Sequence, residues 1–477
     1  MTSWTAGRSR VTGLGLALLA ALSSGCGGAS RASSPSSSPA GLPVAVSVQR
    51  PATGPRLETG FVGFSYEKSR LNLPLFNTGN TGLVALFRFL GPGILRVGGN
   101  SVDKTTWDNA GLGLTSGKVA PPDVDRLAGF LKASNWRVIY GLNFATNTPS
   151  QMADEAAYAA NALGASLYGF ELGNEPDLYH SNGLRPTTYT YSAFLAEWRN
   201  YAAALQAKMA SAVFTGPASA YNTSGFTSPF AKDQGSALQL LTQHYYRADG
   251  QLVTSTVDLL LSPDPNLPGI LQALKQSAAA TPGGYRLAEA NSFYNGGAPN
   301  VSDAYGTALW AIDFLFTNAL NGSSGVNFHG GGNSTGYTPI ADDGTHVVMA
   351  RPEYYGLALV AMAAPGRILT TMVSAGTLSF SAYAVAADDG TTALVLVNKD
   401  RAQTATVTTG LGVSATSANL TVLTGTSLDS PTGTLLNGAA IGADGSWSPQ
   451  PSVNVGVVNS SLILTVPPAT AVLARIR

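Results

Sequence analysis

The sequence predicts an α/β fold: a (β/α)8 barrel with a C-terminal all-β sandwich domain that also takes an N-terminal strand. Eight strand-like segments alternate with helix-like segments between about residues 61 and 329. After about residue 368, alternating runs of Val, Thr, Leu and Ala are separated by Gly, Asn, Asp and Ser turns, which is typical of an all-β region. An isolated alternating segment, Val44–Val48, precedes the first barrel strand and has no place in the barrel.

The predicted barrel strands share a short apolar run bounded by turn or helix signals. They are Phe61–Tyr66, Ile94–Gly98, Trp136–Leu142, Tyr168–Leu172, Val213–Gly216, Leu240–Tyr245, Tyr285–Glu289 and Val326–His329. The helix patterns between them include Asp123–Ala133, Tyr191–Met209 and Ala304–Leu320. A doubly wound open sheet is the alternative, but no glycine-rich phosphate-binding fingerprint follows the first strand.

One predicted helix has a well-marked start. Thr148 can cap it, Pro149 suits its first position, and Gln151 completes a capping box.

The composition allows a large core and excludes some partners. The chain has 477 residues, of which 44% are hydrophobic and only 11% charged, and 27 basic residues balance 27 acidic ones. A chain without a basic field is a poor partner for nucleic acid or for a long polyanion. Its one cysteine, Cys26, excludes an internal disulfide. We expect a monomer.

Residues 1–26 have the pattern of a signal peptide. Arginines precede the apolar run Val11–Leu22, which is too short to span a bilayer. The run ends in Leu-Ser-Ser-Gly-Cys, which resembles a bacterial lipoprotein box with Ser23 in place of the usual large aliphatic residue. We therefore expect an exported protein, either a cell-surface lipoprotein anchored through Cys26 or a secreted protein whose cysteine is incidental.

The rest of the chain divides into four segments. Residues 27–43, rich in Ser, Pro, Ala and Gly, are predicted to be a flexible linker. Residues 44–58 carry the strand that joins the β-domain, residues 59–367 form the barrel, and residues 368–477 form the β-sandwich domain. In this arrangement both ends of the folded chain meet in one sheet.

A carboxylate stands at the end of the fourth predicted strand. The segment Tyr168–Asp177 is an apolar strand that stops at Gly-Asn-Glu-Pro. Pro176 ends the strand and pushes Glu175 toward extended or turn geometry. Because chemistry in a parallel barrel takes place at the carboxyl ends of the strands, Glu175 is a candidate catalytic residue. The alternative is an exposed loop acid, since Asn-Glu-Pro is a short motif.

A second carboxylate, Glu289, ends the seventh predicted strand. We expect Glu175 and Glu289 to face each other across the barrel mouth. Two converging carboxylates are the machinery of glycoside hydrolysis: one is a general acid and base, and the other is a nucleophile when the two are about 5–5.5 Å apart. The general acid must stay protonated near neutral pH, which a like charge nearby favours. The alternative for Glu289 is a buried structural acid paired with an arginine.

Around these two acids the chain resembles glycoside hydrolase family 79, the heparanase and β-glucuronidase family of retaining barrel enzymes. The resemblance covers roughly residues 44–477. It is carried by Gly173–Pro176, which marks the wider clan, and by the more specific segment Glu289–Pro299, Glu-Ala-Asn-Ser-Phe-Tyr-Asn-Gly-Gly-Ala-Pro. The resemblance implies that Glu175 is the acid/base, that Glu289 is the nucleophile, and that no cofactor is needed.

The resemblance also implies a clamp for the carboxylate of the sugar. Tyr294, Asn295 and Gly296 would offer a phenol and backbone N–H groups brought close by the glycines. Tyr337, just past the eighth strand, would be a third donor. The alternatives are a surface turn for the loop and a core aromatic for Tyr337.

Other positions at strand ends take roles by the same resemblance. Glu67 would hold sugar hydroxyls, unless it is a solvent-facing acid. Asn100 would do the same, where the family more often has a threonine. Asn174 would contact the hydroxyl beside the reacting carbon. Arg96 would point inward and fix the surroundings of the nucleophile.

The segment His244-Tyr245-Tyr246 places His244 and Tyr246 on one face of a strand. Tyr246 would donate a hydrogen bond to Glu289, and His244 would line the site or be a satisfied core histidine. Four histidines and one cysteine give little support to a metal site, so we expect none.

We therefore predict a retaining exo-acting β-glucuronidase that releases terminal β-linked glucuronic acid from a glycan or glycoside. The basic residues Lys232, Arg247 and Lys275 are scattered, which argues against an endo-acting, heparanase-like hydrolase that grips a sulfated chain. Two further alternatives remain: a clan-related β-glycosidase acting on neutral sugars, and a non-catalytic glycan-binding surface lipoprotein.

Overall fold

The computed structural model describes residues 41–477. The predicted signal peptide, the lipidation of Cys26 and most of the predicted linker lie outside this range. Within it, none of the helices combines the length and the apolar character that crossing a membrane requires.

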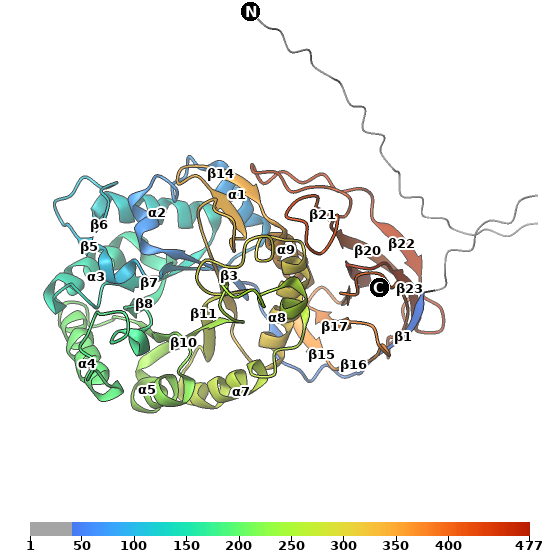
Figure 1. Cartoon of the computed structure of the whole chain (residues 1–477), viewed down its shortest axis with the longest axis horizontal. Helices are drawn as coiled ribbons and strands as arrows, with labels where there is room; N and C mark the ends of the chain where they lie inside the picture. The colour runs from blue at the N-terminus through green and yellow to red at the C-terminus, as the bar shows by residue number, and fades with distance from the viewer. Residues whose placement is uncertain (1–40) are drawn as a thin grey trace, which may run out of the picture. The chain divides into compact units, whose positions relative to one another are not determined.

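Eight parallel strands close into a barrel in which each strand pairs with its neighbours along the chain (Figure 1). The strands are β3 (Val62–Glu67), β4 (Ile94–Gly98), β7 (Arg137–Leu142), β8 (Leu167–Leu172), β9 (Phe214–Ser219), β10 (Leu238–Tyr246), β11 (Tyr285–Asn291) and β12 (Val326–Gly330). Each overlaps one of the eight predicted strands, and the predicted fold class is confirmed. Most of their residues are buried, because helices cover the outside and side chains fill the interior.

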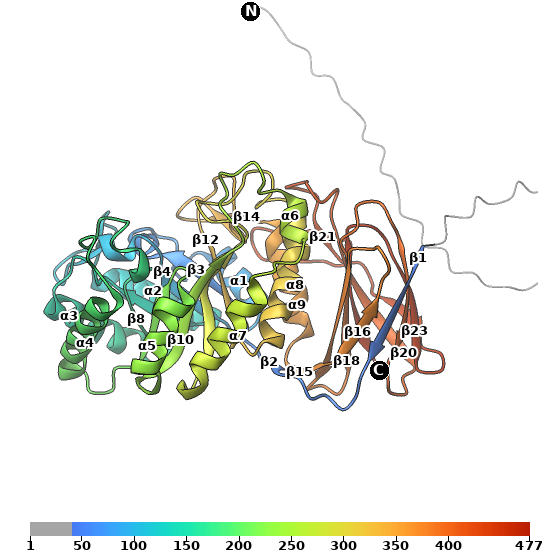
Figure 2. The same ribbon diagram turned by 60° about the horizontal axis from the view of Figure 1, so that its bottom comes forward.

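Nine α-helices lie in the described range, most of them around the barrel (Figures 1 and 2). They are α1 (Thr81–Phe89), α2 (Pro121–Ser134), α3 (Pro149–Leu163), α4 (Tyr191–Lys208), α5 (Ser228–Gln234), α6 (Val257–Leu261), α7 (Leu267–Ser277), α8 (Gly306–Leu320) and α9 (Pro352–Ala363). The predicted capping box opens α3: the Thr148 hydroxyl accepts a hydrogen bond from the Gln151 N–H, and the Gln151 side chain accepts one from the Thr148 N–H.

Two short pairs of strands, one parallel and one antiparallel, extend the loops at the carboxyl ends of the barrel strands. The pair β5 (Thr106–Trp107) and β6 (Lys118–Val119) follows β4, and the pair β13 (Ile340–Asp342) and β14 (Val347–Ala350) follows β12.

The β-domain consists of two sheets. The smaller has the order β16 (Thr371–Ser374), β1 (Leu42–Val48), β19 (Ala405–Gly410), β23 (Ser461–Val466). The larger has the order β2 (Arg56–Leu57), β15 (Gly366–Leu369), β17 (Phe380–Ala387), β18 (Thr392–Asn398), β24 (Thr470–Ile476), β20 (Ser417–Thr424), β21 (Leu435–Leu436), with β22 (Val453–Gly456) paired to β20. In Figure 2 the blue strand β1 lies among the orange and red strands of this domain.

The N-terminal strand is an inner strand of its sheet. It runs antiparallel to β16 and parallel to β19. The alternation seen in the sequence gives it one apolar face, and Val44, Val46 and Val48 are buried in the core between the two sheets.

The larger sheet turns its other face to the barrel helices. Apolar residues of that face, such as Val395 and Leu473, belong to the same buried cluster as the barrel core. The ring of Phe316, in α8, stacks on Tyr383, in β17, with centroids 4.4 Å apart. A continuous apolar core therefore joins the barrel to the β-domain.

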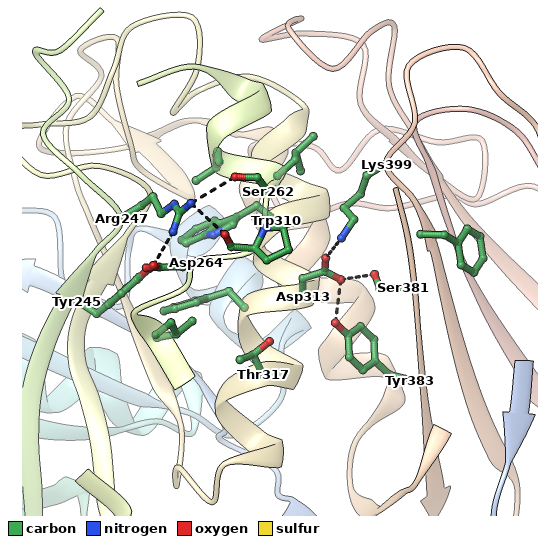
Figure 3. A pocket seen from close by; sticks show the side chains of 16 residues that line it. Tyr245, Arg247, Ser262, Asp264, Trp310, Asp313, Thr317, Ser381, Tyr383 and Lys399 are labelled. Carbon is green, nitrogen blue, oxygen red and sulfur yellow. Dashed lines mark hydrogen bonds and ion pairs between the residues drawn. The ribbon is translucent and has the colours of Figure 1, made fainter. Parts of the chain in front are cut away.

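A polar junction accompanies this core. Asp313 of α8 accepts hydrogen bonds from Ser381 at 2.6 Å and from Tyr383 at 3.0 Å, and it pairs with Lys399 (Figure 3). All three partners come from the β-domain, so one half-buried helix carboxylate is held by three groups of the neighbouring domain.

A cavity of about 320 Å³ lies beside this junction. Its opposite wall carries Asp264, which pairs with Arg247 at 2.7 Å and accepts a hydrogen bond from Tyr245 (Figure 3). Along β10 and just beyond it, Tyr245 and Arg247 alternate with His244 and Tyr246, so the cavity and the barrel mouth lie on opposite faces of the strand. Because its polar groups satisfy one another, we interpret the cavity as part of the domain junction.

The acid Glu353, in α9, makes folding stability depend on pH. It is 1% exposed, and burial raises its pKa to about 8 although Asn291 donates a hydrogen bond to it. A carboxyl group whose pKa is raised on folding stabilises the fold while it is protonated. That contribution is complete below its ordinary pKa of 4.5 and is lost as the pH rises toward 8.

We expect Glu353→Gln to remove this loss, because glutamine stays neutral. The variant should match the wild type near pH ~5 and be more stable by about 1–4 kcal/mol above pH ~8. Denaturant unfolding at the two pH values measures the difference. Equal changes in both proteins between the two pH values would show that Glu353 does not titrate in this range.

Candidate active site

The turn after β8 carries Glu175. The backbone of Glu175 is left-handed, with φ 52° and ψ 53°, and Pro176 begins a short 3-10 helix. The Glu175 N–H donates to the carbonyl of Ala218, near the end of β9, at 2.9 Å. The sequence predicted extended or turn geometry before Pro176, and Glu175 adopts the turn geometry, with a left-handed backbone. For a non-glycine residue this conformation costs about 1–2 kcal/mol. Residues with such backbone strain cluster at functional sites.

A β-bulge sets the direction of Glu289. In the pairing of β10 with β11, Gln243 lies opposite Leu287 while His244 lies opposite Glu289, so Ala288 is an extra residue. Bulges next to active sites re-aim side chains. Here the bulge brings the carboxylate of Glu289 to the barrel mouth beside the end of β10.

The carboxylate of Glu289 is held in its charged form. Arg96 donates to its Oε2 at 2.6 Å and Tyr246 to its Oε1 at 2.8 Å. Burial alone would raise the pKa of Glu289, yet nearby groups outweigh burial and keep the pKa well below its ordinary value. These groups are, in order of their effect, His329, His244, Arg96 and Tyr246. Glu289 is therefore ionised at neutral pH, as a nucleophile must be.

The two acids converge on His244. Its Nδ1 lies 2.9 Å from Oε1 of Glu175 and 3.9 Å from Oε1 of Glu289. One oxygen of each carboxylate and this nitrogen all lie within 4.8 Å of one another. This spacing fits the short separation of about 5–5.5 Å in retaining glycosidases better than the ~6.5–9.5 Å of inverting ones.

These three residues are also the group in residues 41–477 whose ligand atoms are spaced to hold a metal ion. His244 is already hydrogen-bonded to Glu175, and Glu289 is already bound by Arg96 and Tyr246. A cation would have to displace these contacts, and the set contains only one nitrogen ligand.

Arg96 ties three barrel strands together. Its guanidinium is fully buried in β4 and donates to Glu171 at 2.6 Å, to Glu289 at 2.6 Å and to the Asn174 side chain at 2.9 Å. The other oxygen of Glu171 accepts a hydrogen bond from Thr242 at 2.7 Å. Because the guanidinium group is planar and rigid, its pairing with two carboxylates fixes both of them in position.

The pairing of Glu289 with Arg96 does not seal the acid. The side chain of Glu289 keeps 8% of its exposure and that of Glu175 keeps 15%. Arg96 occupies Oε2, whereas Oε1 faces Tyr246 and His244.

Glu67, Asn100 and Asn174 form one hydrogen-bonded group. The carboxylate of Glu67 accepts from the N–H groups of Asn100 at 3.2 Å and Ser101 at 2.7 Å. The Asn174 side chain donates to the side-chain oxygen of Asn100 at 3.2 Å. Asn100 is exposed and Glu67 is half-buried, so both remain accessible at the mouth.

The loop after β11 places Tyr294, Asn295 and Gly296 beside Tyr337. Asn295 and Gly296 have positive φ angles of 61° and 83°, and the Gly296 carbonyl accepts from the Tyr337 N–H at 3.2 Å. Tyr294 is 45% exposed. The Asn295 side chain donates to Asp249 at 3.0 Å and is turned to that neighbour.

Tyr337 reaches toward the acids. Its ring centroid lies 5.7 Å from that of Tyr246 and 5.9 Å from that of His329. Burial and the charge of Glu289 raise its pKa, so its phenol is protonated and can donate.

Two site residues were missed by the sequence analysis. His329, the last residue of the eighth predicted strand, lies 3.4 Å from Oε2 of Glu289 and 3.0 Å from the Ser65 hydroxyl. The rule that polar residues at strand ends are functional would have found it.

Asp103 is the second site residue that the sequence analysis missed. It is buried and accepts hydrogen bonds from the N–H groups of Phe144, Ala145 and Asn174 and from the hydroxyl of Tyr179. Burial outweighs these bonds and raises its pKa to about 6. It lies in a short 3-10 helix, Val102–Lys104, that contains no motif, so no sequence signal marks it.

Comparisons with known proteins support the resemblance to the heparanase and β-glucuronidase family. No protein-family model matches the chain. A β-glucuronidase of Aspergillus niger is 28% identical over 332 residues, 61% of this chain and 61% of that protein. A β-glucuronidase of Neurospora crassa is 26% identical over 55% of each chain, and rat heparanase is 29% identical over 44% of this chain and 41% of its own length. The matched region spans about 60% or less of each of these relatives.

Solved structures share the fold. A 4-O-α-L-rhamnosyl-β-D-glucuronidase from Fusarium oxysporum has a TM-score of 0.75 at 20% identity, covering 91% of this chain and 99% of that chain. A family 51 arabinofuranosidase from Xanthomonas axonopodis pv. citri has a TM-score of 0.68 at 15% identity, covering 91% of this chain and 100% of that one. At these identities the likeness establishes the architecture alone.

Removal of the Arg96 guanidinium should lower the stability of the fold, because Glu171 and Glu289 would stay buried without their cation. We expect Arg96→Met to lower the free energy of unfolding by about 3–5 kcal/mol. Denaturant unfolding measures the loss. The matched control is Arg96→Met combined with Glu171→Met, which removes one orphaned charge and should recover part of the stability. No recovery in the double variant would contradict the assigned ion pair.

Proposed function

We propose that this chain is a retaining, exo-acting β-glucuronidase that hydrolyses terminal β-linked glucuronic acid from a glycan or glycoside. The observation that carries the proposal is the convergence of Glu175, Glu289 and His244, whose nearest oxygen and nitrogen atoms lie within 4.8 Å of one another. The names of the similar curated proteins, β-glucuronidase and heparanase, support the glycoside hydrolase class.

In the first step, Glu289 attacks the anomeric carbon and Glu175 protonates the glycosidic oxygen as the bond to the leaving group breaks. The proton of Glu175 leaves with the alcohol, and the sugar stays on Glu289 as an ester. In the second step, Glu175 takes a proton from water, and the resulting hydroxide displaces Glu289. Two inversions give net retention.

The surrounding groups suit the two acids to different roles. Glu289 has two strong donors, Arg96 and Tyr246, and a lowered pKa, so it serves as the charged nucleophile. The carboxyl oxygen Oε1 of Glu175 is hydrogen-bonded to His244, whose ring can donate to the ionised acid or accept from the protonated one. The acid can therefore keep this contact in both steps.

Neutral donors would hold the carboxylate of the sugar. The Tyr294 and Tyr337 phenols and the Gly296 N–H would come from the loops after β11 and β12, which meet where the Gly296 carbonyl accepts from the Tyr337 N–H. An anion bound by such donors needs no salt bridge. Glu67 and Asn100, at the ends of β3 and β4, and Asn174, in the turn after β8, would take the sugar hydroxyls.

Exo action is supported by the low charge of the chain. Of the scattered basic residues, Arg247 is paired with Asp264 on the far face of β10 and cannot grip a substrate at the mouth. A polyanionic chain running through the site would meet few cations.

A β-glycosidase acting on a neutral sugar is the second candidate. One observation favours it: Asp249 accepts the Asn295 amide, which places a carboxylate beside the proposed clamp. A negative charge there works against binding the carboxylate of glucuronic acid.

A panel of 4-nitrophenyl glycosides tests the proposed function. We expect kcat/KM for the β-glucuronide to exceed that for the β-glucoside and β-xyloside by at least about 10²-fold, because buried polar donors left unpaired penalise a substrate that lacks the carboxylate. Glu289→Gln, the matched inactive control, should lose turnover while still binding glucuronate. A preference for the neutral glycosides, or activity like the wild type in Glu289→Gln, would overturn the proposal.

Tyr246→Phe should shift the pH profile of activity. The phenol hydrogen bond is one of the causes that lower the pKa of Glu289, so its loss raises that pKa. Because the nucleophile works when ionised, the acidic limb of kcat/KM should move upward by about 1 pH unit. The pH dependence of β-glucuronide hydrolysis measures the shift. An unchanged acidic limb would show that Tyr246 does not act on Glu289.

A further inference from the structure

One large aromatic side chain close to the candidate acid stands open to solvent. Tyr221 follows β9 and is 71% exposed. Single exposed apolar residues are common on protein surfaces and by themselves need no explanation. Tyr221 differs in that the backbone of its segment is held on both sides.

Asp177 binds the segment from the side of β8. One carboxylate oxygen accepts from the Ala220 N–H at 2.8 Å, and the other accepts from the N–H groups of Tyr221 at 3.4 Å and Asn222 at 3.3 Å. One side chain thus holds three consecutive N–H groups around the exposed ring.

Gln243 binds the same segment from the side of β10. Its buried side-chain oxygen accepts from the hydroxyls of Thr223 at 2.9 Å and Thr227 at 2.7 Å. These two threonines bound a short π-helix, Thr223–Thr227, which the Asn222 side chain caps. The exposed ring therefore stands on a rigid base, which lowers the entropy cost of binding through it.

The segment that carries Tyr221 is bound to the turn that carries Glu175. Asp177 lies two residues after Glu175, and the Glu175 N–H donates to Ala218, three residues before Tyr221. In the proposed reaction Glu175 protonates the leaving oxygen. Apart from Asn174, which shares the turn of Glu175, the groups assigned to glucuronate come from β3, β4, β11 and β12, and none comes from β9. The ring accordingly lies on the leaving-group side of the acid.

The charge around the ring selects the kind of leaving group. Residues 218–227, Ala-Ser-Ala-Tyr-Asn-Thr-Ser-Gly-Phe-Thr, contain no charged side chain. The nearest charge is the Asp177 carboxylate, which would repel an anionic group. Beside this carboxylate, the exposed phenol ring of Tyr221 can bind an uncharged flat ring.

We propose that Tyr221 is a specificity-determining residue that stacks against the first ring of the leaving group. This inference rests on the proposed function. The ring it takes is uncharged, and it is either an aryl group or a neutral pyranose that presents its C–H face. Stacking acts before the glycosidic bond breaks and is absent from the second step, in which the leaving group has departed.

The test compares methyl and phenyl β-D-glucuronide as substrates of the wild type and Tyr221→Ala. We expect kcat/KM for the phenyl glucuronide to fall about five- to tenfold and kcat/KM for the methyl glucuronide to change by less than about twofold. Tyr221→Trp should keep the phenyl activity. Ile463→Ala, which truncates a 61% exposed apolar residue of the β-domain, is the matched control and should leave both substrates unchanged.

The substrate pair separates stacking from a structural effect. A methyl glucuronide depends more on the acid because methanol is the poorer leaving group, so a displaced Glu175 would lower methyl turnover at least as much as phenyl turnover. That result, or no loss with either substrate, would overturn the proposal. A glucuronic acid β-linked to a neutral hexose, tested beside the phenyl glucuronide, shows which of the two ring types Tyr221 prefers.

Failure of the proposed function gives a different result. The wild type would then hydrolyse neither glucuronide but would hydrolyse a neutral glycoside. The same methyl and phenyl pair of that sugar would decide the role of Tyr221: a selective loss with the phenyl substrate supports stacking, and an equal or absent loss overturns it.

Discussion

The candidate site depends on one buried guanidinium. Arg96 lies inside the barrel with no exposure and spans Glu171 of β8, Glu289 of β11 and Asn174 of the turn that carries Glu175. A cation that pairs with both carboxylates offsets the cost of burying them. Arg96 therefore offsets the burial of the Glu289 charge and, through Asn174, links the position of Glu289 to the turn that carries Glu175.

Much of this arrangement could be predicted because its signals are local. The apolar runs of the barrel strands, the capping box at Thr148 and the alternation of Val44–Val48 each reflect a short-range preference, and the structure contains all three. Polar residues at strand ends pointed to Glu175 and Glu289, and the structure brings them together. The bulge at Ala288 and the left-handed Glu175 could not be predicted, since each is imposed by pairing with a distant strand. Asp103 could not be predicted either, because its four donors come from two distant segments, the loops after β7 and β8.

The barrel and the β-domain act as one structural body in the described part of the chain. Apolar residues of the larger sheet belong to the cluster that fills the barrel, and Asp313 is held by three side chains from the β-domain. The end of β10 serves both regions: His244 and Tyr246 face the two acids, while Tyr245 and the following Arg247 face the junction. A single strand thus contributes residues both to the packing at the domain boundary and to the groups around Glu289.

The inner position of β1 has a consequence for biosynthesis. Residues 42–48 are made before every other strand in the described part of the chain, yet their partners, residues 371–374 and 405–410, emerge from the ribosome more than 300 residues later. Throughout synthesis of the barrel, β1 is a valine-rich strand with both edges unpaired, which is the kind of segment that pairs with the wrong neighbour. Folding of the β-domain cannot start at its N-terminus and must wait for the end of translation, so a nascent chain of this protein needs protection for its earliest strand rather than its last.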